Sequence, residues 1–219
     1  MLSFDPMTLN VPPQAEEESF HGKTPSDQEL QEVLEATDQS LVIPERKRHP
    51  QLLLCPVGLV GAGKTPVVKS LSERLGLVRI SNDEIRQRFM QKSLNYSRTS
   101  EAARSLIKKY LSEGYSVAID ADCACSTKEL IDQLATNPQI KPVWIHINPP
   151  EEFILHKLRT IKYTGQWIMP SAEVALDNYF RRKPLHEHLD LPFLYTFDPS
   201  KENLAKQIDE AVRLIENIH

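Results

Sequence analysis

The sequence has little glycine and little cysteine, with 7 and 3 among its 219 residues, and no apolar run approaches the roughly 18 residues of a membrane-spanning helix. With 40% hydrophobic and 26% charged residues, the composition excludes a collagen-like or low-complexity chain and indicates a soluble globular domain. The cysteines lack the spacing of zinc ligands, so we expect reduced thiols at Cys55, Cys123 and Cys125. The N-terminus lacks the basic and apolar regions of a signal peptide, and we expect a cytoplasmic protein.

Charge is unevenly distributed along the chain. The first 45 residues contain ten acidic residues against the single base Lys23, a net charge of -9, whereas the whole chain has a net charge of -4. The rest of the chain therefore has a net charge of +5. This mild excess is below that of a dedicated duplex-binding protein, but it suits an anionic ligand held in one cleft.

The N-terminal region is predicted to contain a tail and one helix. Residues 1–25 combine prolines and a run of three glutamates with few apolar residues, so we expect a disordered acidic tail. At 26–29 the sequence SDQE has the spacing of a capping box, and Leu30, Val33 and Leu34 follow at helical intervals. We therefore expect a short helix at about 27–40 that docks on the domain, within a helix-and-linker segment at 26–50.

From residue 51 onward, short β-rich apolar runs alternate with helical segments. Strands are predicted at 52–57, 77–80, 117–120, 143–147 and 193–197. Helices are predicted at about 65–75, 83–91, 98–113, 126–135, 150–160 and 200–217. Strands separated by helices require crossover connections, so we predict an α/β fold, with one three-layer domain over 51–219 and a five-stranded parallel sheet.

The strongest functional motif lies between the first strand and the first helix of this domain. Residues 58–65, GLVGAGKT, have the pattern G-x-x-x-x-G-K-[ST] of a phosphate-binding loop. Successive backbone N–H groups at a helix N-terminus make an anion site, for which the candidate residues are Gly58, Gly61, Ala62 and Gly63. Lys64 is expected to span the β- and γ-phosphates, and the Thr65 hydroxyl to ligate Mg²⁺.

Proline at position 66 is unusual in such a loop. Its fixed φ suits the first turn of a helix, but it has neither the N–H nor the side-chain hydroxyl that would reach the α-phosphate. One neutral donor contributes about 0.5–1.5 kcal/mol net. We therefore expect Pro66 to weaken nucleotide binding without abolishing it.

A nucleoside triphosphate also needs its magnesium ion held from a second side. The predicted strand at 117–120 ends in Asp120, which we expect to support the ion as a direct ligand or through water, with Asp122 as a substitute. The alternative is that Asp120 caps the following turn, which is a common role for an acid at the end of a strand.

A second pair of charged residues follows the predicted strand at 77–80. Because parallel strands end at the same edge of a sheet, Asp83 and Arg86 are expected to face the same crevice as the phosphate loop. Asp83 could accept the proton of an attacking hydroxyl, and Arg86 could hold the acceptor or the developing charge. The alternative is a helix cap with a surface ion pair between residues three apart.

These motifs together resemble the P-loop kinases related to phage polynucleotide 5′-kinase and zeta toxin. The resemblance rests on residues 58–65, 82–86 (NDEIR) and 117–120 (VAID), and covers about residues 51–217. It implies that Asp83 is the general base, that Arg86 contacts a phosphate, and that a mobile lid, here about 161–183, follows the fourth strand. The family often has Arg-x-x-Arg near the start of the lid, where this chain has Arg159 and then Lys162.

Arg159 is therefore the candidate for closing over the γ-phosphate. Placed over a phosphate site, the lid would exclude water and deliver cations to the phosphoryl oxygens. The alternative is that these basic residues lie on a solvated surface helix. The nearby pair His186 and His188 is not a zinc motif, since residues two apart do not align on one helix face.

The expected acceptor side, between residues 86 and 109, is rich in basic residues. Phosphate contacts from these residues, with stacking on Phe89 and Tyr96, could grip the end of a nucleic acid. A phosphorylated metabolite, or a merely solvated helix face, would fit the same pattern. The basic residues are Arg86, Arg88, Lys92, Arg98, Arg104, Lys108 and Lys109.

The sequence therefore predicts a kinase that uses ATP and Mg²⁺ to phosphorylate a hydroxyl group. A polynucleotide 5′-hydroxyl is the leading acceptor hypothesis. A small-molecule kinase, acting on a sugar, nucleotide-sugar or antibiotic hydroxyl, is the first alternative. A regulatory module that binds nucleotide and signals to a protein partner is the second, and Pro66 favours it.

Overall fold

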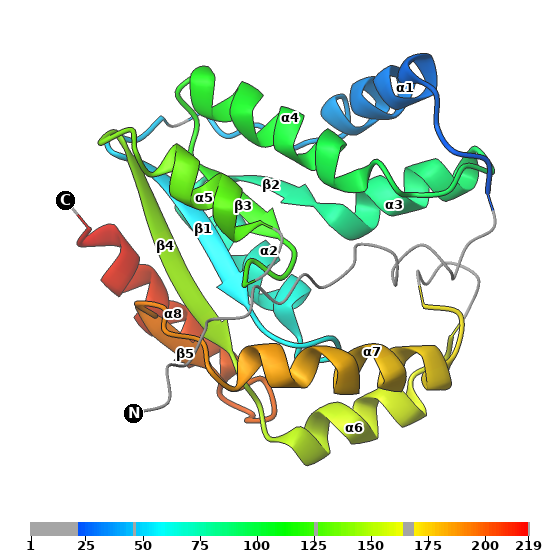
Figure 1. Cartoon of the computed structure of the whole chain (residues 1–219). Coiled ribbons are helices and arrows are strands. Elements are labelled where there is room, and N and C mark those ends of the chain that lie inside the picture. Colours follow the sequence, from blue (N-terminus) through cyan, green and yellow to red (C-terminus); the bar gives the residue numbers. More distant parts are fainter. Residues whose placement is uncertain (1–21, 46, 125–126, 164–168, 219) are drawn as a thin grey trace, which may run out of the picture.

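The computed structural model describes residues 22–45, 47–124, 127–163 and 169–218. In this part of the chain, parallel strands form a five-stranded sheet in the order β2-β3-β1-β4-β5 (Figure 1). The strands are β1 (Gln51–Val57), β2 (Val78–Ser81), β3 (Val117–Asp120), β4 (Ile140–Ile147) and β5 (Tyr195–Phe197). The predicted α/β class and the five-stranded parallel sheet are confirmed.

Helices connect the strands and close the chain. They are α1 (Asp27–Asp38), α2 (Lys64–Leu75), α3 (Asn82–Gln91), α4 (Thr99–Ser112), α5 (Lys128–Leu134), α6 (Glu151–Thr160), α7 (Ala172–His186) and α8 (Leu204–Glu216). The last strand and the last helix are shorter than predicted at their N-terminal ends. In each case a local turn comes first: the Phe193 N–H binds the Leu191 carbonyl, and the Ser200 N–H binds the Asp198 carboxylate.

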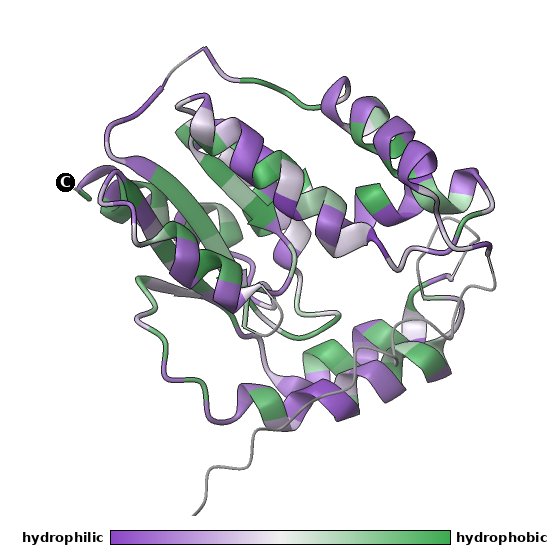
Figure 2. Cartoon of the chain, turned by 45° about the horizontal axis from the view of Figure 1, so that its top comes forward, coloured by the Kyte–Doolittle hydropathy of each residue, from purple (hydrophilic) through white to green (hydrophobic). Residues whose placement is uncertain are grey.

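The core lies on both faces of the sheet. All seven residues of β1 are buried, and successive side chains point to opposite faces. Leu53 and Cys55 pack with the side of α3, α4 and α5, whereas Leu52 and Leu54 pack with the side of α2 and α8. Figure 2 shows hydrophobic strands beside helices that have both hydrophilic and hydrophobic residues.

Helix α1 lies outside α3 and α4, as a docking helix (Figure 1). The predicted capping box is present: the Glu29 N–H binds the Ser26 hydroxyl at 3.2 Å, and the Ser26 N–H binds the Glu29 carboxylate at 2.9 Å. Leu30 and Val33 are buried in the core cluster of α3 and α4. Most of the predicted acidic tail, residues 1–21, lies outside the described residues.

Helices α6 and α7 run together near the carboxyl ends of the strands, beside the start of α2 (Figure 1). They follow β4 and lie on either side of residues 164–168, which the structure does not describe. Among the described cysteines, Cys55 and Cys123 are buried free thiols. None of the helices in the described ranges has the length and apolar character needed to cross a membrane.

Candidate active site

The loop between β1 and α2 requires glycine for two different reasons. Gly61 and Gly63 have φ values of 80° and 94°, in the left-handed region that side chains disfavour. Gly58 instead lies against β4, and a Cβ there would come within 2.6 Å of the Ile147 carbonyl oxygen. The backbone therefore curls tightly around the N-terminus of α2, as the motif predicts.

Lys64, the first residue of α2, folds back over this loop. Its Nζ donates to the carbonyl oxygens of Gly58 at 2.7 Å and Leu59 at 3.0 Å. Burial lowers the pKa of Lys64, and the carboxylates of Asp122, Asp83 and Asp120 oppose that shift, Asp122 most strongly. Three acidic residues from two strand ends thus favour the charged form of the ammonium group of the loop.

The two residues predicted to hold magnesium are in contact. The Thr65 hydroxyl donates to Asp120 Oδ1 at 3.2 Å, while Arg79 of β2 pairs with Asp120 Oδ2. Burial raises the pKa of Asp120, against the opposing effects of Arg79 and Thr65. Mg²⁺ prefers oxygen ligands and usually takes only one or two from the protein, with phosphate and water completing the octahedron. A hydroxyl beside a carboxylate fits that ion.

No larger group of acidic, histidine or cysteine side chains suited to a metal is present in the described ranges. The structure therefore offers the two oxygen donors at Thr65 and Asp120, and no closed structural metal site among the residues it describes.

Asp83 and Arg86 lie at the start of α3, on the same edge of the sheet as Asp120. In the β2–β3 register Ser81 pairs with Asp120, so Asp83 follows only two residues after that pair. Arg86 forms an ion pair with Asp83 at 3.0 Å, and its guanidinium lies 5.7 Å from the centre of the Tyr96 ring. The Asp83 side chain is 60% exposed, which leaves it accessible to an acceptor.

Helix α6 places a different cation at the loop from the one expected. Lys157 is half-buried, and its Nζ would lie 3.9 Å from a Cβ on Gly63. Its pKa is lowered, first by burial and then by the charge of Lys64. Arg159, the predicted residue, is exposed in the last turn of α6. Residues two apart on a helix point about 200° apart, so one helix cannot present both side chains to the loop.

Asp122 connects the loop to α7. Its Oδ1 accepts from the Gly58 N–H at 3.4 Å, its Oδ2 lies 2.9 Å from His186 Nε2, and Arg182 approaches Oδ2 at 3.7 Å. Burial raises the pKa of Asp122, but the hydrogen bond from His186 and the charges of Lys64 and Arg182 lower it further than burial raises it.

Sequence reasoning named Asp122 only as a substitute metal ligand and did not identify His186 or Arg182 as its partners. Spacing within α7 gave no signal for this contact. The only available hint was an acid two residues after the strand-end Asp120, which marks the same edge of the sheet.

The aromatic residues proposed for base stacking are not available. Phe89 has no exposed surface and Tyr96 is 7% exposed, because both belong to the core beside α3 and α4. The stacking part of the nucleic-acid hypothesis is therefore wrong for these two side chains.

Comparison with known families agrees with this geometry. A family model described as AAA domain matches residues 53–169, more than half of the chain. The chain belongs to this AAA domain family. A search of the curated proteins finds no match.

Solved structures with the same fold include a putative kinase and a toxin–antitoxin system. A putative kinase from Chloroflexus aurantiacus is 15% identical, with a TM-score of 0.56, and the match covers 77% of this chain and 98% of that one. A structure of the PezAT chromosomal toxin–antitoxin system of Streptococcus pneumoniae is 17% identical, with a TM-score of 0.53, and the match covers 88% and 98%. At these identities the likeness extends to the fold of this AAA domain.

Proposed function

We propose that this AAA domain protein is a phosphotransferase that moves the γ-phosphoryl group of ATP to an acceptor hydroxyl, with Mg²⁺. The observation that carries the proposal is the convergence of three functional groups on one edge of the sheet. The ammonium group of Lys64, the oxygen pair of Thr65 and Asp120, and the accessible carboxylate of Asp83 lie together there. The likeness in fold to a putative kinase supports the same reaction class.

Each residue then has one role. The N–H groups of residues 58–63 and the Lys64 ammonium bind the phosphate oxygens. Thr65 and Asp120 would hold Mg²⁺, which neutralises charge on the β- and γ-phosphates when bound. Lys157 is the cation beside the loop and takes the role expected of Arg159.

Asp83 accepts the proton of the acceptor hydroxyl in the transfer step. The acceptor oxygen forms a bond to the γ-phosphorus while the bond to the β–γ bridging oxygen breaks, and ADP leaves with that electron pair. Arg86, held against Asp83, is positioned to contact the transferred group or the acceptor.

Two variants test the proposal. Lys64→Ala should lower the affinity for Mg-ATP in calorimetry by at least tenfold, whereas Lys69→Ala, an exposed lysine of the same helix, should leave it unchanged. If Lys64→Ala and Lys69→Ala bind ATP equally well, the phosphate loop does not bind nucleotide.

Asp83→Asn should abolish transfer from labelled ATP while ATP still binds. A screen of oligonucleotides, sugars and nucleosides identifies the acceptor for this assay. The control is Asp132→Asn, which changes an exposed acid of α5. Binding without transfer to any acceptor in the unmodified protein would favour the regulatory module. Two observations support that second candidate: Pro66 lacks a donor, and Asp120 is paired with Arg79.

A further inference from the structure

The acidic N-terminal helix neutralises the basic acceptor side. Three carboxylates of α1 each pair with a cation of α4 or of the loop between α3 and α4. Asp27 binds Arg98 at 2.7 Å, Glu32 binds Lys92 at 2.7 Å, and both carboxylate oxygens of Asp38 lie 2.7 Å from Lys109. Three of the seven basic residues predicted to face an acceptor are therefore already paired with carboxylates of α1.

Helix α1 is held in place by more than charge. Between these carboxylates its apolar side, with Leu30 and Val33, is buried in the core beside α3 and α4, and Thr37 is also buried. At the C-terminal end of α1, the Tyr110 hydroxyl donates to Asp38 at 2.8 Å. At that end too, Arg88 donates to the Ser40 hydroxyl at 2.6 Å. The acids are thus fixed over the basic residues by a packed helix.

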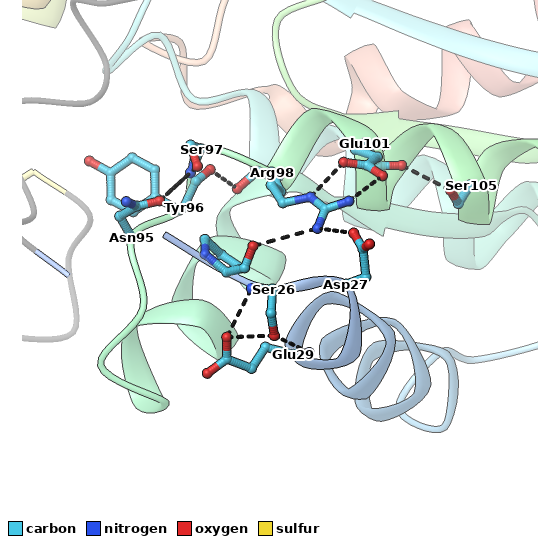
Figure 3. Close-up of polar contacts among 11 residues, drawn as sticks. Ser26, Asp27, Glu29, Asn95, Tyr96, Ser97, Arg98, Glu101 and Ser105 are labelled. Atoms are coloured by element: carbon cyan, nitrogen blue, oxygen red, sulfur yellow. Dashed lines mark hydrogen bonds and ion pairs between the residues drawn. The ribbon is translucent and has the colours of Figure 1, made fainter. Parts of the chain in front are cut away.

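The N-terminal end of α1 is fixed in the same way (Figure 3). The Arg98 guanidinium lies between Asp27 and Glu101, with two further 2.7 Å bonds to the Glu101 carboxylate. Before the helix, Lys23 forms a parallel bridge with Leu94, and the Asn95 N–H donates to the Lys23 carbonyl at 2.9 Å. The chain from residue 22 to the end of α1 therefore follows the acceptor side along its length.

A polyanion on this surface would have to replace these carboxylates. Each phosphate contact made by Lys or Arg releases counterions and adds about 0.7 to the slope of log affinity against log salt for a single strand. A cation that is already paired with a fixed carboxylate makes no such gain, because its own charge is already neutralised. The α1 carboxylates also repel phosphates that approach the same helices.

We propose that the acids of α1 act as a specificity filter, which keeps polyanions off α3 and α4 and restricts the acceptor to a small hydroxyl compound. This inference rests on the proposed phosphotransferase function. It replaces the polynucleotide 5′-end, the leading hypothesis from the sequence, with the first alternative.

The test is the triple variant Asp27→Asn, Glu32→Gln, Asp38→Asn, which keeps the apolar side of α1 unchanged. Its binding to a labelled single-stranded DNA oligonucleotide with a 5′-hydroxyl is measured by fluorescence anisotropy, without nucleotide, between 50 and 200 mM salt. We expect about tenfold or greater tightening over the unmodified protein at low salt, and a salt slope steeper by about 2.

The control variant makes the same change in net charge elsewhere: Glu35→Gln, Asp132→Asn, Asp209→Asn. The Glu35 carboxylate accepts from Gln31 of its own helix at 3.0 Å. Asp132 pairs with Lys128 within α5, and Asp209 of α8 pairs with Arg74 of α2. Equal oligonucleotide binding by the two triple variants would overturn the filter. So would phosphorylation of the oligonucleotide by the unmodified protein.

Two further measurements keep the result interpretable. If the triple variant melts at a much lower temperature, two single variants make the same comparison. Glu32→Gln removes one of the paired charges of α1, and Glu35→Gln is its control. Mg-ATP binding is measured on the same samples. Loss of the proposed function would appear as no ATP binding in the unmodified protein, whereas failure of the filter would appear only in the oligonucleotide data.

Discussion

His186 Nε2 lies 2.9 Å from Asp122 Oδ2, although 64 residues separate them, and both side chains are 7% exposed. This contact joins the end of α7 to the carboxylate that accepts the Gly58 N–H. The position of the phosphate loop therefore depends on a helix from the C-terminal half of the chain.

His186→Ala should destabilise the protein and weaken nucleotide binding. A buried hydrogen bond to a charged group contributes about 1.5–3 kcal/mol, and its loss leaves Asp122 without its closest partner. We expect a fall in melting temperature of several degrees and a several-fold rise in the Kd for Mg-ATP. His188→Ala, an exposed residue two positions on, is the matched control. Identical melting curves and Kd values for the two variants would contradict this account of the contact.

Lys157→Ala should reduce phosphoryl transfer more than Arg159→Ala does. Lys157 lies beside Gly63 in the loop, whereas Arg159 points to solvent. Removing a cation that contacts a developing negative charge costs on the order of tenfold to a thousandfold in rate. The comparison of kcat between the two variants is the measurement. A larger loss in Arg159→Ala would show that the lid rearranges and brings that residue to the phosphates.

Pro66→Ser should strengthen nucleotide binding. Residue 66 is exposed in the first turn of α2, so the substitution restores an N–H and a hydroxyl without disturbing the core. One or two new neutral hydrogen bonds, each of about 0.5–1.5 kcal/mol, correspond to an increase in affinity of roughly 2- to 150-fold. Calorimetry with Mg-ATP measures the change. An unchanged or weaker affinity would mean that the α-phosphate does not approach this turn.

The docking of α1 should depend on acidity. The hydrogen bond from Lys92 lowers the pKa of Glu32. Burial raises the pKa of Asp38, and the bonds from Lys109 and Tyr110 lower it by more. Because the folded-state values are depressed, the ion pairs contribute full stability above the ordinary carboxyl value of about 4 and lose it as the pH falls through the lowered values.

The double variant Glu32→Gln, Asp38→Asn measures the contribution of these ion pairs to stability. Its melting temperature should be below that of the unmodified protein at pH 7, and the difference should shrink as the pH falls below about 4. A difference that does not change as the pH falls below about 4 would mean that the substitutions act through packing and not through charge.

The fold could be predicted because its signals are local. The apolar run of β1, the capping box of α1 and the glycine pattern at 58–65 each lie within a few residues, and each is typical of the local structure observed there. The meeting of Asp120 with Thr65 was also predictable, since parallel strands end at one edge.

The remaining contacts depend on distance in the sequence or on helical phase. Whether Lys157 or Arg159 faces the loop is decided by where α6 begins and how it packs, which no motif states. The partner of Asp122 comes from α7, and the partners of the α1 acids come from residues about 60 to 71 positions away. Charge counts located these acids and bases on different segments but could not pair them.

The two bonds from Lys64 to the Gly58 and Leu59 carbonyl oxygens give the loop an internal competitor for any arriving phosphate. Only the difference in free energy between the contacts that Lys64 gains and the two hydrogen bonds that it gives up contributes to affinity. A ligand therefore binds tightly only if its contacts with Lys64 more than replace those two bonds. Pyrophosphate or a single phosphate, offering fewer contacts in exchange, should therefore bind disproportionately poorly compared with the full triphosphate.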